Sequence, residues 1–435
     1  MTLPVTLRAL RYRNFQLFFG GQLISLIGTW MQNVAQAWLV YKMTGSSVLL
    51  GLASFSGQIP VFLMAPVGGI VADRFRRQRI VIATQTAAML LALVLAALTL
   101  TGVVQVWHII VLSALLGVVN AFDIPARQAF FVEMVGREDL INAIALNSSM
   151  FTASRIIGPA IAGILVASIG EGWCFFANGV SYIAVIAGLL LMTLAEHGST
   201  KAPGSPLADV IEGFRFVTGH APIHHLMILL GIVSLTGTPL SVLMPIFADK
   251  ILHGGAKGLG ILMGASGVGA LAGALLLASR ETVAGLGRWI AISAGAFGVF
   301  LMALAVSRSF WLSCGLLLPV GFAMMVEMGS SNTLIQSMSP DRLRGRVMSV
   351  YSMMFMGMAP LGAVVSGVTA ARWGAPATVA GSGLICMAAA AVFGWRWPRL
   401  RTQARRLLDA ARMAGVPPHS ATAGGLAIET GDEVA

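Results

Sequence analysis

The sequence predicts an all-α integral membrane protein with twelve transmembrane helices that form two six-helix pseudo-repeats. Its composition is 57% hydrophobic and only 10% charged, with a mean hydropathy of +0.84, whereas soluble domains carry about 25% charged residues. Twelve apolar runs follow one another along the chain, and each is long enough to cross a bilayer as a helix. These runs cover residues 14–40, 47–72, 78–101, 105–130, 140–168, 172–194, 223–248, 257–279, 286–307, 310–337, 343–370 and 375–397.

An internal repetition divides these runs into two halves. The segment 131–160 reads as a short charged loop followed by a helix with polar residues and a late proline, and the segment 335–362 repeats this order. Parallel halves with a binding site between them are an architecture of secondary transporters. The expected parts are an N-terminal half at 1–194, a cytoplasmic linker at 195–222, a C-terminal half at 223–397 and a disordered cytoplasmic tail at 398–435.

The distribution of lysine and arginine predicts the orientation of the chain. If both termini are cytoplasmic, most of the 28 lysines and arginines fall on the cytoplasmic side, and Arg155 falls within a span. Those on the opposite face are Lys42, Lys250, Lys257, Arg308 and Arg372. Cytoplasmic loops carry an excess of basic residues, so we expect a multi-pass protein of the inner (plasma) membrane with cytoplasmic termini. The net charge of +11 then suits anionic lipid and does not require nucleic acid.

Polar residues at helical spacing form a stripe along the first run, 14–40, and a shorter stripe with Ser234 and Thr238 in the run 223–248. Such a face must turn away from lipid. It could join helices by hydrogen bonds, but its length favours a water-filled cavity that binds substrate. The members of the longer stripe are Gln22, Ser25, Thr29, Gln32, Asn33 and Gln36.

The stretch 68–79 places one acid and four arginines between two apolar runs. Its paired glycines allow close helix packing, and its arginines cannot enter hydrocarbon, so a helix ends here at a membrane face. The pattern formed by Gly69, Asp73, Arg74 and Arg77 resembles the signature between the second and third helices of the major facilitator superfamily. The resemblance implies that Asp73 meets the N-terminus of the eleventh helix, where a carboxylate is favoured, and holds the cytoplasmic side shut. The alternative is that the arginines only mark a cytoplasmic loop.

Further segments narrow this resemblance to the third drug:proton antiporter family, which includes enterobactin and macrolide exporters. The similarity extends over nearly the whole chain, and it implies export of a small organic molecule, such as a drug-like compound or a siderophore, in exchange for protons. We expect the protein to act as a monomer. The segments that carry the resemblance are 13–15, 20–25, 123–128, 157–159, 212–214 and 344–349.

Charged residues within the predicted spans are the best guide to a pathway, because an unpaired charge there costs several kcal/mol. Asp123 and Arg127 share a helix face that Asn120 extends, and they form either a structural pair or part of the proton-coupling machinery. Glu327 has no cation within its own turn. Carboxyl groups removed from water and from cations hold a proton more readily. Glu327 is therefore our leading candidate for proton coupling, and a structural ion pair with Arg155 is the alternative.

Arg155 lies in the run 140–168, just ahead of Gly158, Pro159 and Gly163. This glycine–proline segment resembles the antiporter motif of helix five, in which small residues permit close packing and the proline bends the helix. A lone arginine within a span requires an acid or a ligand as its partner. We therefore place Arg155 among the residues of the substrate cavity.

The linker contains one predicted helix. Ser205 and Pro206 provide an N-cap and a first-turn proline, and an apolar face follows at helical spacing. An amphipathic helix on the cytoplasmic surface is expected. Its apolar face consists of Leu207, Val210, Ile211, Phe214 and Val217.

Two classes of function remain. The first is a secondary active transporter that works by alternating access, favoured as an exporter over an importer of a small metabolite. The second is a transporter-like sensor that binds a ligand without moving it. An enzyme is not expected, because the sequence has no phosphate-binding loop, no metal-spaced histidines or cysteines and no nucleophile with an evident base. No metal and no cofactor are therefore expected.

Overall fold

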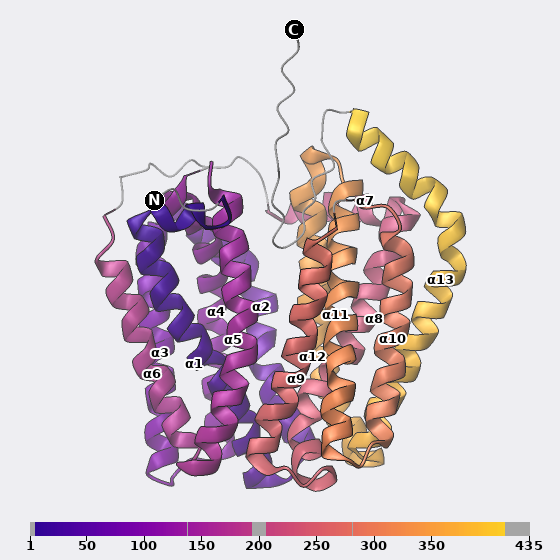
Figure 1. The fold of residues 1–435 in the computed structure, drawn as a ribbon. Coiled ribbons are helices and arrows are strands. Elements are labelled where there is room, and N and C mark those ends of the chain that lie inside the picture. Colours follow the sequence, from indigo (N-terminus) through magenta and orange to yellow (C-terminus); the bar gives the residue numbers. More distant parts are fainter. Residues whose placement is uncertain (1–4, 137, 194–205, 281, 414–435) are drawn as a thin grey trace.

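The computed structural model describes residues 5–136, 138–193, 206–280 and 282–413, and within these ranges the chain forms helices and no strand (Figure 1). The first part comprises η1 (Val5–Arg11), α1 (Arg13–Thr44), α2 (Ser47–Arg74), α3 (Arg77–Leu100), α4 (Val106–Val135), α5 (Leu140–Ser168) and α6 (Glu171–Leu190). The second comprises α7 (Pro206–Gly219), α8 (Ala221–Ile246), the π-helical turn η2 (Phe247–Ile251), α9 (Gly255–Ala278), α10 (Leu286–Val306), α11 (Phe310–Met338), α12 (Asp341–Trp373) and α13 (Ala375–Met413).

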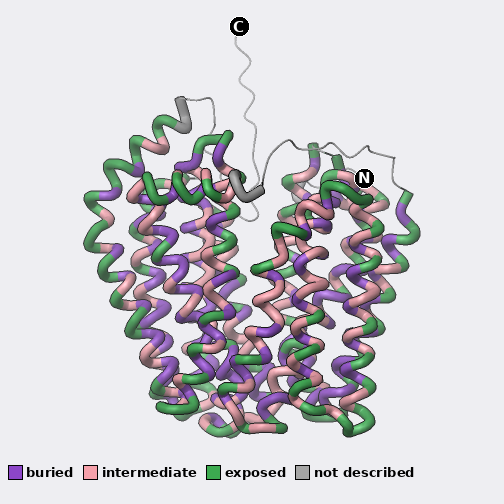
Figure 2. Tube along the Cα trace, turned by 180° about the vertical axis from the view of Figure 1, so that it is seen from behind, coloured by how far each residue is buried: buried purple, intermediate pink, exposed green. Residues whose placement is uncertain are grey.

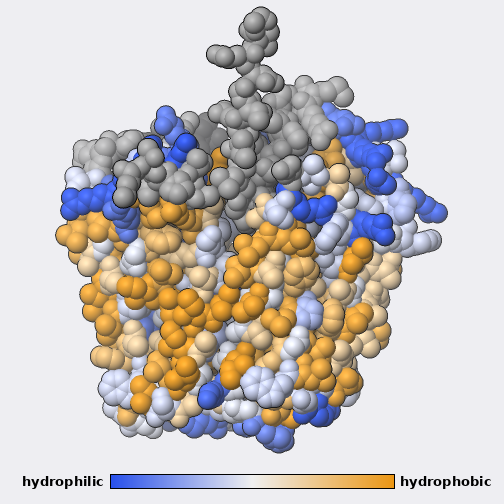
Figure 3. All heavy atoms as spheres, in the orientation of Figure 1, coloured by the Kyte–Doolittle hydropathy of each residue, from blue (hydrophilic) through white to orange (hydrophobic). Residues whose placement is uncertain are grey.

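Eleven of the described helices are long and apolar enough to cross a membrane. The remaining predicted span is α1. Its 32 residues are enough to cross a membrane, but its amide side chains lower its mean hydropathy. These amides are Gln22, Gln32, Asn33 and Gln36. α1 packs against α5 and α6, which cover much of its surface with protein. Apolar residues form a broad belt across the face of the molecule seen in Figure 3, with hydrophilic residues toward its two ends. This belt is the surface that a membrane-spanning protein presents to lipid.

The predicted two-fold repetition of six helices is confirmed by the packing. In the first half, α2 packs against α4, while α1 and α3 pack against α6. In the second half, α9 packs against α11, while α8 and α10 pack against α13. Each pair in one half corresponds in chain order to a pair in the other. Buried residues gather between the helices of each half and at the end where the two halves meet (Figure 2).

Glycines set the closest helix crossing in each half. A Cβ atom at Gly68 of α2 would overlap the carbonyl oxygen of Ala121 in α4. In the second half, a Cβ at Gly321 of α11 would overlap the carbonyl oxygen of Ser266 in α9. In lipid, where apolar side chains gain little by leaving the solvent, such backbone contact is a main source of helix association.

The two halves contact each other through α2 with α12 and through α5 with α9. Ser47 at the start of α2 donates a hydrogen bond to the Gly367 carbonyl at 2.8 Å. A Cβ at Gly163 of α5 would lie 3.1 Å from the Cα of Gly260 in α9. These contacts lie at one end of the bundle, and Figure 1 shows the halves separating toward the other end, where α1 begins and α13 ends.

The linker helix α7 packs against α12. Glu212 forms ion pairs with Arg342 and Arg346 near the start of α12. Within the predicted apolar face, Val217 is buried, whereas Ile211 and Phe214 are exposed. The expected surface helix is therefore present and is attached to the second half. Residues 195–205 of the linker lie outside the described residues.

The C-terminal tail differs from the expected disorder over part of its length. α13 does not end near residue 397 but continues to Met413. Leu400 and Ala404 are buried in this extension, so apolar contacts stabilise a segment that is rich in arginine. Residues 414–435 lie outside the described residues.

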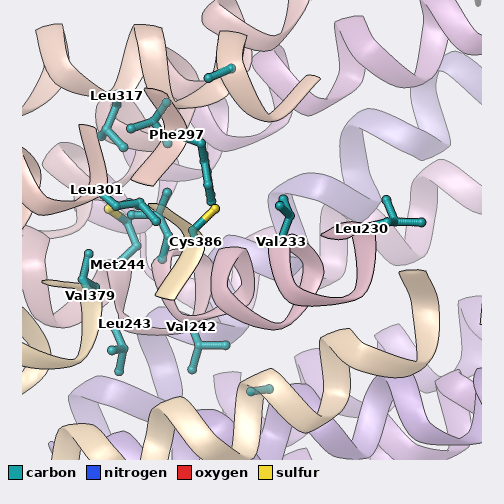
Figure 4. Packing of buried hydrophobic residues seen from close by; sticks show 14 of the residues in the cluster. Leu230, Val233, Val242, Leu243, Met244, Phe297, Leu301, Leu317, Val379 and Cys386 are labelled. Atoms are coloured by element: carbon teal, nitrogen blue, oxygen red, sulfur yellow. The ribbon is translucent and has the colours of Figure 1, made fainter. Parts of the chain in front are cut away.

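The largest apolar cluster includes the interior of the second half (Figure 4). Phe297 and Leu301 of α10 lie there near Leu317 of α11, and Cys386 of α13 lies beside Phe297. The Cys386 thiol donates a hydrogen bond to the Ala294 carbonyl at 3.3 Å. This cysteine is a small buried packing residue.

Candidate functional site: polar and charged groups within the helix bundle

The predicted gating motif lies where α2 ends and α3 begins. Asp73 is exposed, and Arg77 donates to Glu133 of α4 at 2.9 Å, which ties the start of α3 to the end of α4. A Cβ at Gly69 would meet nothing within 4 Å, so the glycine that permits close packing is Gly68. The predicted contribution of Gly69 to helix packing was therefore wrong. The eleventh membrane span is α12, because α7 belongs to the linker. A latch between Asp73 and the N-terminus of α12 stays a prediction.

Asp123 and Arg127 form the expected pair inside the first half. Arg127 Nε lies 3.3 Å from Asp123 Oδ2, and the carboxylate is almost fully buried. Its other oxygen, Oδ1, accepts hydrogen bonds from Thr84 at 2.8 Å and from Gln85 at 2.9 Å. Because donors from α3 and α4 satisfy this carboxylate, it holds the two helices together. Its role in coupling stays a prediction.

The polar stripe of α1 turns mainly toward the helices of its own half. Gln32 accepts a hydrogen bond from Asn178 of α6 at 2.7 Å, and Gln36 donates to Ser113 of α4 at 2.9 Å. Asn33 is the member that is exposed. These contacts favour the alternative interpretation, in which the stripe joins helices by hydrogen bonds.

Three further members of the stripe also lie against protein. Gln22 and Ser25 are almost fully buried, and the Thr29 hydroxyl lies 3.4 Å from the Tyr182 hydroxyl of α6. These contacts support the alternative for this part of α1, and its role as a wall of a substrate cavity stays a prediction. The sequence contained a signal for the partner helix, since Asn178 and Tyr182 lie four residues apart on α6.

In the second stripe, Ser234 joins two helices, whereas the Thr238 hydroxyl bonds within α8. Ser234 of α8 donates to the Phe355 carbonyl of α12 at 2.7 Å, and Thr238 donates to the Ser234 carbonyl at 2.8 Å. Asn120 of α4 is half-buried.

Arg155 lies at the junction of α1, α5 and α9. Its guanidinium lies 5.9 Å from the centre of the Trp30 ring, and Trp30 in turn meets Phe151 edge to face at 5.5 Å. Gly158 makes this contact possible, because a Cβ atom added at this position would lie only 2.5 Å from the Trp30 side chain. The backbone of Arg155 also approaches Gly267 of α9, so this arginine stands where the two halves meet.

The helix-five motif performs the predicted packing role. Gly158 brings α5 against α1, and Gly163 brings α5 against Gly260 of the other half. Pro159 lies inside α5, and its carbonyl oxygen would be 2.5 Å from a Cβ at Gly260. The glycine–proline segment therefore places Arg155 next to the contact between the halves.

Glu327 is fully buried in α11. Its Oε1 accepts a hydrogen bond from Ser331 at 3.0 Å, and its Oε2 has no hydrogen-bond partner among the described residues. Tyr351 of α12 and Cys386 of α13 lie close enough to interact electrostatically with this carboxylate. Glu327 thus lies inside the second half, enclosed by neutral groups.

The alternative ion pair between Arg155 and Glu327 is not formed in this structure. Within the described ranges, no carboxylate lies within ion-pair distance of Arg155, and no cation lies within that distance of Glu327. Arg155 and Glu327 are thus charge-bearing groups inside the helix bundle without an ion-pair partner among the described residues, which marks both as candidate functional residues.

A contact that the sequence interpretation missed connects the halves at their joined end. The Tyr41 hydroxyl of α1 donates to Asp249 of η2 at 2.7 Å, and Lys250 lies 6.0 Å from the centre of the Tyr41 ring. Nearby, Lys42 forms an ion pair with Glu171 at 3.1 Å. The sequence did contain a sign of this contact, because the charged neighbours Asp249 and Lys250 directly follow an apolar run.

The comparisons with known proteins agree with this architecture. A family model described as a transmembrane secretion effector of the major facilitator superfamily matches residues 5–417. The staphyloferrin A transporter of Staphylococcus aureus is 25% identical over 85% of this chain and 93% of its own. The multidrug efflux pump Tap of Mycolicibacterium fortuitum is 27% identical over 85% of this chain and 91% of its own.

A solved structure supports the fold alone. The crystal structure of the nucleoside transporter NupG superposes with a TM-score of 0.70 at 12% identity, covering 92% of this chain and 99% of that chain.

Proposed function

We propose that this chain, which belongs to the transmembrane secretion effector family of the major facilitator superfamily, exports a small organic molecule in exchange for protons. The staphyloferrin and multidrug relatives make a siderophore or a drug-like compound the substrate class to test first. Acting as a monomer in the plasma membrane, the protein would expose its site to each side in turn as the two halves rock.

The observation that carries this proposal is Arg155. It is a cation at the junction of the halves, it has no carboxylate partner among the described residues, and it lies beside Trp30 and Phe151. A guanidinium can bind a carboxylate or catecholate oxygen while the aromatic rings contact an apolar or aromatic part of the same molecule. We infer that Arg155 binds an anionic group of the substrate and that Glu327 carries the proton.

Transport by inverted membrane vesicles tests this proposal. Vesicles with an acidic interior are offered labelled catecholate siderophores, macrolides and cationic dyes, and uptake is measured with and without a protonophore. We expect protonophore-sensitive uptake of an anionic substrate, lost in Arg155→Ala and partly retained in Arg155→Lys, because lysine keeps the charge but not the planar fork.

Other outcomes would favour the alternative functions. Concentrative uptake by right-side-out vesicles alone would identify an importer. Saturable binding to the purified protein without movement into either kind of vesicle would identify a sensor.

A topology test addresses the orientation on which this proposal depends. An alkaline phosphatase fused to the C-terminus should be inactive, and one inserted at Gly254, between η2 and α9, should be active, because basic residues are concentrated at the end where α1 begins and α13 ends. A β-lactamase at the same two positions serves as an independent reporter. The reverse pattern would overturn the orientation and the assignment of export.

A further inference from the structure

A cavity of about 980 Å³ lies at the end of the second half where α13 ends. Its walls come from the end of α9, the connection to α10, the first turns of α10 and the extension of α13, with Thr333 and Leu334 of α11 at its inner side. The cavity is lined by none of the residues that were predicted to act in gating, proton coupling or substrate binding.

The cavity exists because α13 packs closely on α10 and then departs from it. A Cβ at Gly287 of α10 would overlap the Trp397 indole, so the two helices touch there. Pro398 follows immediately and cannot donate a backbone hydrogen bond within the helix. Beyond it, α13 leans over the end of the bundle (Figure 1). Space is left between this extension and α10.

Four arginines line the cavity, and one acid, Asp409, accompanies them. Among the described residues none of the four arginines forms an ion pair. They come from three separate segments of the chain, so the positive charge is built by the fold and not by a local run of sequence. The arginines are Arg280, Arg288, Arg401 and Arg405.

Arg280 is fixed in place with unused hydrogen-bonding capacity. Its guanidinium stacks 4.8 Å from the centre of the Trp289 ring, and Nη2 donates to the Ala284 carbonyl at 3.4 Å. Its Nη1 is shielded from water and has no hydrogen-bond acceptor among the described residues. A shielded guanidinium nitrogen favours an anionic acceptor, and the planar fork of arginine matches phosphate geometry.

The position of the cavity indicates which phosphate it takes. Ile292 lines the cavity and is 56% exposed on the apolar belt, so the apolar wall continues onto the surface that faces lipid. Hydrophilic side chains lie directly above this belt at the upper right edge of the molecule in Figure 3, the side on which Figure 1 shows α13. A soluble phosphate compound would not need an apolar wall that opens sideways.

We propose that this cavity binds the headgroup of an anionic phospholipid, with its phosphodiester on the arginines and the start of its acyl chains along Ile292. Anionic lipids are abundant on the cytoplasmic side of membranes and are attracted to clustered basic residues. Binding would fix the extension of α13 against α10 and the α9–α10 connection.

The test measures lipid binding to the full-length protein purified in a neutral detergent. Phosphatidylglycerol is titrated against the protein, with phosphatidylcholine as the neutral reference, and bound lipid is counted by native mass spectrometry. The double variant Arg280→Gln, Arg405→Gln should bind phosphatidylglycerol at least about tenfold more weakly, because two charge-assisted hydrogen bonds are lost.

A matched control removes the same amount of charge outside the cavity. Arg399→Gln combined with Arg406→Gln changes two exposed arginines of the same extension that do not line the cavity, and this variant should bind phosphatidylglycerol as the parent does. If the first double variant does not give a monodisperse protein, Arg288→Gln with Arg401→Gln replaces it under the same criterion.

Two results would overturn the proposal. Equal weakening in the cavity and control variants would mean that lipid binds the general basic surface. Displacement of phosphatidylglycerol by millimolar inorganic phosphate, with no preference over phosphatidylcholine, would mean that the cavity accepts a soluble anion and not a lipid.

Discussion

Glu327→Gln is expected to abolish accumulation of substrate against its gradient while leaving exchange of substrate across the membrane intact. Glutamine imitates the protonated carboxyl group but cannot release a proton. If one proton moves per substrate, a gradient of one pH unit supports accumulation of up to about tenfold, and the variant should reach a ratio near one. Inverted vesicles measure both processes, with and without an imposed pH gradient.

The physical basis of this expectation is the enclosure of Glu327. The side chain has one hydrogen bond, from Ser331, and among the described residues no cation forms an ion pair with it. Ionisation there is unfavourable in one conformation and becomes favourable if the halves move to admit water. Ser331→Ala is the matched control, because it removes the hydrogen bond but keeps the carboxyl group, and it should still accumulate substrate. Full driven transport by Glu327→Gln would move the coupling role to Asp123.

Gly321→Val should greatly reduce the amount of folded protein. The new side chain would collide with the Ser266 carbonyl of α9, and backbone on both sides of the contact cannot move without opening the crossing of α9 and α11. Overpacking of this kind costs about 1–3 kcal/mol or more. The melting temperature and the monodisperse yield in detergent measure the effect.

A control on the same helix separates this collision from a general intolerance of valine in α11. A Cβ at Gly315 would meet nothing within 4 Å, so Gly315→Val should leave yield and melting temperature nearly unchanged. If both variants behave like the parent protein, the close approach of α9 and α11 is not important for stability.

The sequence alone predicts the order and approximate limits of the helices, because twelve apolar runs separated by short connections leave little choice in a membrane. It does not predict how each helix is rotated about its own axis. Gly68 and Gly69 illustrate this point, since adjacent positions on a helix point about 100° apart and only Gly68 meets α4. The same limit applies to the polar stripe of α1. The spacing of its residues identifies one face of the helix, but only the position of α6 shows that Asn178 covers that face.

Two other expectations depended on tertiary contacts that no local pattern contains. The pairing of Arg155 with Glu327 assumed that both lie between the halves, whereas Glu327 is enclosed within the second half. The extension of α13 has the composition of a solvated tail, yet Leu400 and Ala404 bury apolar surface there. By contrast, the pairing of Asp123 with Arg127 required only a helix, and it is present.

The hydrogen bond between Tyr41 and Asp249 affects the balance between the conformations of the transporter. It joins α1 of one half to η2 of the other, so it holds only while the halves touch at that end. Hydrogen bonds to charged groups contribute about 1.5–3 kcal/mol, which corresponds to a population ratio of roughly ten or more. On the proposed topology, this hydrogen bond favours the conformation in which the halves are closed at the exterior face. For the proposed exporter, this bias turns the binding site toward the side where its cargo is made, and it opposes the entry of molecules from outside.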